Sequence, residues 1–143
     1  MIRTGSPVNG LESKGEQLIR EILEREGVLF YQEYSFKELK SFKNKPLRYD
    51  FAIIENGKVV ALIEWQGEQH YSFVEHFSKT KGKWDYAREM DVQKCKFALM
   101  NKIPLYCIPY YEFPNIKTLS DICSEKYLVK SKWHNIEVGR NKN

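Results

Sequence analysis

Residues 47–66 read LRYDFAIIENGKVVALIEWQ, two apolar segments rich in β-branched and aromatic residues that meet at Asn56-Gly57. Such segments are typical of strands, and Asn-Gly between two apolar runs is a strong signal for a β-hairpin. Each segment carries one carboxylate, Asp50 and Glu64, where a core residue is expected. Because burying an unpaired carboxylate is costly, such groups are usually neutralised, hydrogen-bonded or bound to metal. The hairpin is therefore predicted to carry a divalent-metal site.

The predicted site depends on the hairpin register, because side chains alternate between the two faces of a strand. A two-residue Asn56-Gly57 turn pairs residues whose numbers sum to 113, which places Asp50 and Glu64 on opposite faces. A three-residue loop with Gly57 in the left-handed conformation brings the carboxylates to one face, and so does a one-residue bulge. A metal site here requires one of these two irregularities.

The remaining elements follow from hydrophobic periodicity and from Gly and Pro positions. Both faces of the hairpin strands are apolar, which is typical of central strands covered by helices. We expect helices at 13–26, 84–102 and 115–128, and further strands at 28–36 and 103–110. This order predicts a single-domain α/β fold with an α-β-β-β-α-β core, in which helices flank a central mixed sheet, plus a C-terminal helix.

The domain limits and the class of protein follow from composition. Residues 1–10 are expected to form a flexible arm, 11–129 the folded domain and 130–143 a basic tail. The 143 residues are 42% hydrophobic and carry a net charge of +4, which suits one globular domain and is compatible with a polyanionic partner. Three cysteines without CxxC spacing indicate buried thiols in a reducing compartment. With no long apolar segment, the chain is predicted to be soluble and cytoplasmic, without a membrane partner.

The carboxylate pair suits Mg²⁺ (or Mn²⁺), which takes hard oxygen ligands and usually only one or two protein carboxylates. Gln66, two residues after Glu64, could hydrogen-bond a water or a phosphate. The alternative is that Asp50 and Glu64 lie at exposed strand ends and pair with Arg48 or Lys58.

Two further residues could act beside the carboxylates. His70 follows Gly67 just beyond the second strand, and a neutral imidazole is suited to accept a proton from attacking water. Glu16 lies three residues after Ser13, so it either completes a capping box or points at the sheet and extends the acidic cluster.

The helix expected at 84–102 supplies two polar residues at the edge of its apolar stripe. Asp91 could orient the histidine or metal-bound water, and Lys94 could steady a phosphate. The alternative is an internal pair of Asp91 with Arg88 or with Lys94 on a solvated helix edge.

The ordered set Glu16, Asp50, Glu64-Trp-Gln66, His70 and Asp91 resembles the PD-(D/E)XK nuclease superfamily. Within it, the set is most like the branch of very-short-patch-repair and EDxHD homing endonucleases. The resemblance implies a restriction-endonuclease-like core and Mg²⁺-dependent hydrolysis of DNA phosphodiester bonds, with Asp50 and Glu64 as metal ligands. Gln66 replaces the lysine of the superfamily motif, and Lys94 is a candidate for that lysine's role.

Double-stranded DNA is the expected partner, held mostly through phosphate contacts. The residues expected to make these contacts are Lys37, Lys40, Lys43, Lys45, Lys79, Lys81 and Lys83. A homodimer is one way to obtain long-site specificity. The alternative functions are a non-catalytic nucleic-acid-binding module on a nuclease-like scaffold and an enzyme that acts on RNA.

Overall fold

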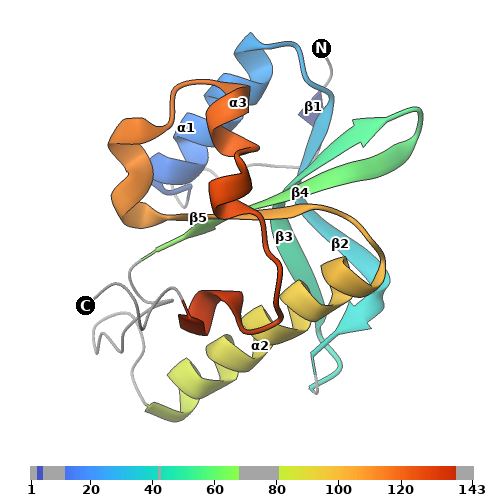
Figure 1. Ribbon diagram of the computed structural model, residues 1–143. Coiled ribbons are helices and arrows are strands. Elements are labelled where there is room, and N and C mark those ends of the chain that lie inside the picture. Colours follow the sequence, from blue (N-terminus) through green and yellow to red (C-terminus); the bar gives the residue numbers. More distant parts are fainter. Residues whose placement is uncertain (1–2, 5–11, 42, 68–80, 138–143) are drawn as a thin grey trace.

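The computed structural model describes residues 3–4, 12–41, 43–67 and 81–137 (Figure 1). Five strands form one sheet in the order β1-β2-β3-β4-β5. Their bounds are β1 Arg3–Thr4, β2 Phe30–Lys40, β3 Pro46–Glu55, β4 Lys58–Gln66 and β5 Leu105–Pro109. The central three strands pair antiparallel, whereas β1 and β5 each join the sheet in parallel, so the sheet is mixed.

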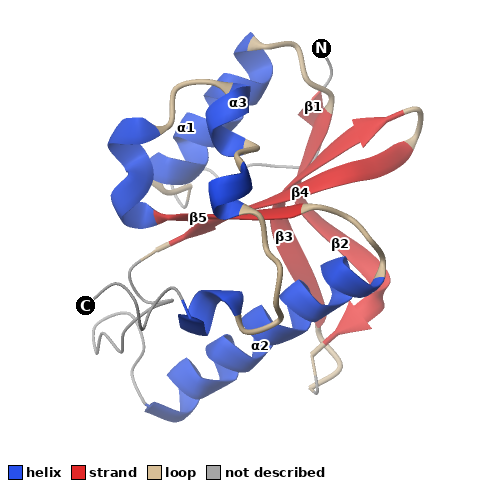
Figure 2. Ribbon diagram, in the orientation of Figure 1, coloured by secondary structure: helices blue, strands red, loops and turns tan. Residues whose placement is uncertain are grey.

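Helices cover both faces of this sheet (Figure 2). Helices α1 (Lys14–Arg25) and α3 (Leu119–Ile122) lie on one face, and α2 (Lys81–Met100) lies on the other (Figure 1). Each face has its own core cluster, one built around Ile19, Phe30 and Ile63, the other around Tyr49 and Leu62. The prediction of a single α/β domain with helices flanking a mixed sheet is confirmed.

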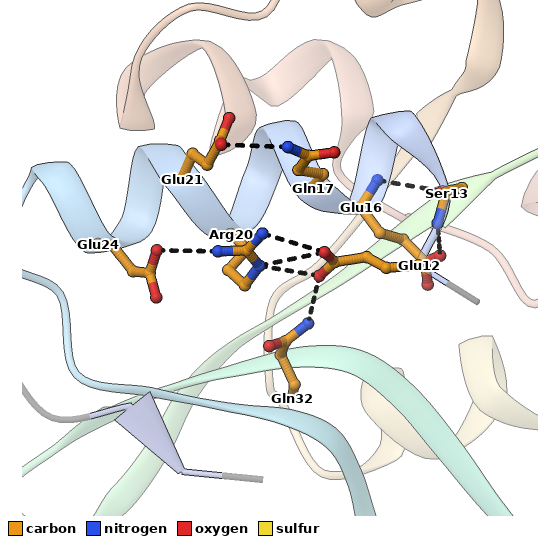
Figure 3. Close-up of polar contacts among 8 residues, drawn as sticks. All are labelled: Glu12, Ser13, Glu16, Gln17, Arg20, Glu21, Glu24 and Gln32. Atoms are coloured by element: carbon orange, nitrogen blue, oxygen red, sulfur yellow. Dashed lines mark hydrogen bonds and ion pairs between the residues drawn. The ribbon is translucent and has the colours of Figure 1, made fainter. Parts of the chain in front are cut away.

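Helix α1 is fixed at its start by local and long-range polar contacts. Ser13 caps the helix by accepting a hydrogen bond from the Glu16 N–H at 3.1 Å. The Glu12 carboxylate pairs with the Arg20 guanidinium, with Arg20 Nε at 3.0 Å, and accepts a hydrogen bond from the Gln32 side-chain amide, also at 3.0 Å (Figure 3). Because Gln32 belongs to β2, this cluster ties the beginning of the helix to the sheet.

The chain after β5 differs from the prediction of one helix over residues 115–128, which is wrong. Only Leu119–Ile122 is α-helical, and it lies between two 3-10 turns, Tyr110–Asn115 and Glu125–Tyr127. Thr118 caps α3, and the Ser124 side chain then accepts from the Lys126 N–H and starts a new turn. Ser and Thr side chains compete with helix propagation in this way.

The two ends of the described chain also pack on the domain. Arg3–Thr4 pairs with Phe30 and Tyr31 of β2, inside the expected flexible arm. Residues 134–137 form a helical turn in the expected basic tail, and Asn135 there is buried. Among the described residues, no helix combines the length and apolar character needed to cross a membrane.

Candidate active site

The β3–β4 hairpin contains the bulge that a shared carboxylate site requires. Asn56 (φ 51°) and Gly57 (φ 74°) are both left-handed, as in a two-residue primed turn. The pairs next to this turn are Glu55–Lys58 and Ile54–Val59, followed by Ile53–Ala61. Val60 is therefore the extra residue of a bulge, and from there on paired numbers sum to 114 instead of 113. This register sets Asp50 opposite Glu64.

Strand β3 also changes face at Asp50. Leu47 and Tyr49 pack in the core cluster on the α2 side, and so do Ala52 and Ile54. Strict alternation cannot place odd-numbered residues before Asp50 and even-numbered residues after it on one face. The strand is thus irregular at the carboxylate, and the sequence shows no sign of this.

The Asp50 and Glu64 side chains take the place of backbone carbonyls as hydrogen-bond acceptors where the regular pairing of β3 with β4 ends. The Asp50 N–H donates to Glu64 Oε2 at 2.7 Å, and the Trp65 N–H donates to Asp50 Oδ2 at 2.8 Å. Regular pairing of β3 with β4 ends just before this point, at Phe51 and Ile63. Each carboxylate is therefore held by a backbone N–H of the opposite strand, with its remaining oxygen directed elsewhere.

Lys94 of α2 completes the group. Its Nζ lies 2.7 Å from Glu64 Oε1, and the two side chains are only 16% and 4% exposed. The Tyr49 hydroxyl donates to the Lys94 backbone carbonyl at 2.7 Å, which holds this turn of α2 against β3. Burial lowers the pKa of Lys94, but the charges of Glu64, Asp91 and Asp50 outweigh it and raise this pKa above its ordinary value. The ammonium group stays charged at neutral pH.

One lysine does not neutralise the site. Burial raises the pKa of Asp50 well above its usual range, and the negative charges of Glu64 and Glu16 raise it further. Lys94 and the Trp65 N–H oppose this shift without cancelling it. The site therefore favours the uptake of positive charge, either a proton or a cation.

Glu16 takes the capping-box alternative. Its Oε1 accepts from the Ser13 N–H at 2.9 Å, in return for the bond that Ser13 accepts (Figure 3). The start of α1 nevertheless lies against the site, because Gly15 packs on the Trp65 ring so closely that an added Cβ would lie 2.0 Å from it. The charge of Glu16 reaches Asp50 from this position.

Glu33 is a carboxylate near the site that sequence reasoning missed. It has a left-handed backbone (φ 54°) inside β2, between two residues that pair with Phe51 and Tyr49 of β3. Partial burial raises the pKa of Glu33, and Glu16 and Glu64 raise it further. Non-glycine residues rarely adopt this backbone, and they concentrate at functional sites. No residue in the surrounding sequence signals it.

The other predicted site residues have different positions. Gln66 is buried, its amide donates to Cys107 Sγ at 3.6 Å, and no described residue pairs with its Oε1. Asp91 is buried on α2 and lines a pocket together with Lys94. His70 lies outside the described residues.

The predicted DNA-binding lysines fall into two groups. Lys37, Lys40, Lys43 and Lys45 are exposed at the β2–β3 end, where Lys43 Nζ lies 4.4 Å from the centroid of the Tyr86 ring on α2. Lys79 lies outside the described residues. Lys81 and Lys83 belong to the first turn of α2.

The donor set fits a hard divalent cation in chemistry and in number. Asp50 and Glu64 supply carboxylate oxygens, and Asp50 Oδ1 accepts no hydrogen bond from the described residues. No group of three or more His, Cys, Asp or Glu side chains within the described ranges is placed to hold a metal ion. Mg²⁺ needs only one or two protein carboxylates, since water and substrate phosphate complete its shell.

Comparisons of the chain with protein-family models, with curated proteins and with solved structures found no match.

Proposed function

We propose that this protein is a metal-dependent endonuclease that hydrolyses DNA phosphodiester bonds on a restriction-endonuclease-like core. The observation that carries the proposal is the group formed by Asp50, Glu64 and Lys94. Two carboxylates face each other across neighbouring strands, and a charged lysine lies 2.7 Å from one of them. A metal-dependent phosphodiesterase needs ligands for its cation, and a fixed positive charge beside them can stabilise the negative charge of the transition state.

Each residue of the group has a distinct role in the proposed reaction. Asp50 and Glu64 would hold Mg²⁺ or Mn²⁺, which when bound neutralises phosphate charge and lowers the pKa of bound water. Lys94 stays charged and would stabilise the scissile phosphate, in the role that Gln66 cannot perform. His70 is proposed to accept the proton of the attacking water.

The remaining residues would position the substrate and the ligands. Asp91 and Glu16 act on the site through their charge, because both are close enough to affect the pKa values of its members. The exposed lysines at the β2–β3 end would contact DNA phosphates on the α2 side. Such contacts give affinity and salt dependence and carry little sequence information.

Plasmid cleavage tests the proposal. Wild type is incubated with supercoiled plasmid and Mg²⁺ or Mn²⁺, beside Asp50→Ala and His70→Ala. Glu55→Ala is the matched control, because it removes an exposed carboxylate from the same hairpin. We expect wild type and Glu55→Ala to cut and the two site variants to lose at least 100-fold in rate. Equal cutting by wild type and Asp50→Ala contradicts the mechanism.

A non-catalytic nucleic-acid-binding module is the second candidate. The observation that favours it is the Lys94–Glu64 ion pair, which already satisfies one of the two carboxylates. A binding module would retain DNA affinity in Asp50→Ala and cut nothing as wild type, with either metal. The same assay with an RNA substrate tests whether the enzyme acts on RNA instead.

A further inference from the structure

A pocket of about 340 Å³ opens beside the candidate active site, between the start of β3 and the middle of α2. It shares Lys94 with the site, so the pocket and the site adjoin each other at this residue. Its lining residues are Pro46, Leu47, Arg48, Ala87, Met90, Asp91 and Lys94.

The pocket has an apolar part and a charged part. Proline, leucine, alanine and methionine side chains form the apolar part, from both elements. Arg48 supplies the pocket's own positive charge, because the charge of Lys94 is already matched by Glu64 at 2.7 Å, and Asp91 adds one carboxylate. Exposed Lys43 and Lys45 extend the positive charge along the adjoining β2–β3 end. This combination suits a ligand with a flat apolar ring and a phosphate.

The volume limits the size of that ligand. Small-molecule sites span roughly 300–1,000 Å³, so a pocket of about 340 Å³ lies at the small end of the range. One nucleotide fits such a space, whereas a stacked pair of nucleotides does not. The charge and the size therefore indicate the same class of ligand.

We infer that this pocket binds one nucleotide of a DNA strand, adjoining the phosphate held at Asp50 and Glu64. The base or the deoxyribose lies on the apolar part, against Ala87 and Met90. The phosphate of this nucleotide is bound by Arg48 at the open side. The inference rests on the proposed function, since it names a subsite for the same substrate.

Pocket filling tests the inference. Ala87→Leu adds bulk inside the pocket, and Gln93→Leu places the same leucine side chain on α2 outside it. Binding of a fluorescent single-stranded oligonucleotide is measured by anisotropy in Ca²⁺, with thermal unfolding of each variant as a folding check. We expect Ala87→Leu to weaken binding at least tenfold and Gln93→Leu to stay within twofold of wild type.

Two further measurements keep the test decisive. Met90→Ala removes an apolar wall without adding bulk, so it should weaken binding at least threefold even if Ala87→Leu does not fold. Arg48→Gln should lower the dependence of log affinity on log salt by about 0.7 units, in line with the loss of one phosphate contact to a single strand.

Competition identifies the ligand that the pocket recognises. A deoxynucleoside 5′-monophosphate should displace the oligonucleotide at lower concentration than inorganic phosphate does. Equal competition by phosphate, or wild-type binding by Ala87→Leu, overturns the inference. If wild type cuts plasmid and Ala87→Leu cuts and binds equally well, the pocket inference fails and the proposed function stands. If binding depends on the pocket but wild type cuts nothing, the proposed function fails instead.

Discussion

Replacing Lys94 with methionine should destabilise the protein by about 3–5 kcal/mol, the usual loss when one partner of a buried ion pair is removed. Methionine keeps the apolar stem, so the change isolates the charge. It leaves Glu64, which is 3% exposed, without its cation. Within the part of the chain that the structure describes, Lys94 is the cation that offsets the repulsion between Glu64 and Asp50, and the variant lacks it. A loss of this size is a large fraction of the total stability of an ordinary domain.

Urea denaturation at neutral pH measures the loss, with Lys96→Met as the control. Lys96 is exposed on the same helix, so its replacement should change the free energy of unfolding by less than about 0.5 kcal/mol. Mn²⁺ should restore more stability to Lys94→Met than to wild type, by up to about 2.7 kcal/mol at a hundredfold excess over its Kd. A loss below about 1 kcal/mol, with no gain from Mn²⁺, would refute the reasoning.

Three further changes test the geometry. Asp50→Asn should stabilise the protein at pH 7. Folding raises the pKa of Asp50, so the wild-type protein loses stability as the pH rises through that pKa, and asparagine removes this loss. Melting curves should show the stability gain of the variant vanish toward pH 4. Deletion of Val60 should remove the bulge and still leave Asp50 opposite Glu64, because the pairs Ile54–Val59 and Ile53–Ala61 become consecutive, so calorimetry should still detect Mn²⁺ binding; a folded variant that no longer binds Mn²⁺ would contradict the register argument. Gly15→Ala should cost about 1–3 kcal/mol in urea denaturation, although alanine favours helices, because its Cβ collides with Trp65; a stabilised variant would disprove the close contact.

Much of the fold could be predicted because its signals are local. The apolar runs and Asn56-Gly57 indicated the hairpin, and Ser13 indicated the start of α1. The prediction of one helix over residues 115–128 was wrong because Thr118 and Ser124 each cap a new turn. The apolar pattern alone does not show that these side chains interrupt the helix. Tertiary packing, rather than periodicity, holds that segment on α1.

The candidate site was predictable in its residue types and not in its geometry. Asp50 and Glu64 stood out as charges in apolar strands, but Val60 is an ordinary strand residue and gives no sign of a bulge. Lys94 reaches Glu64 through the packing of α2 on the sheet, which depends on the whole core. Glu33 looks like any polar residue of a strand, and only its left-handed backbone distinguishes it.

The bulge at Val60 separates the tip of the hairpin from the carboxylates. The pairing of β3 with β4 shifts by one residue at Val60, between the tip and the site. The Asn56-Gly57 turn can therefore be exchanged for other two-residue turns without moving Asp50 relative to Glu64. The tip is exposed and carries none of the proposed site residues. It is therefore a suitable point for inserting an epitope tag or a fluorophore, which would give a labelled protein for binding measurements with its carboxylate pair intact.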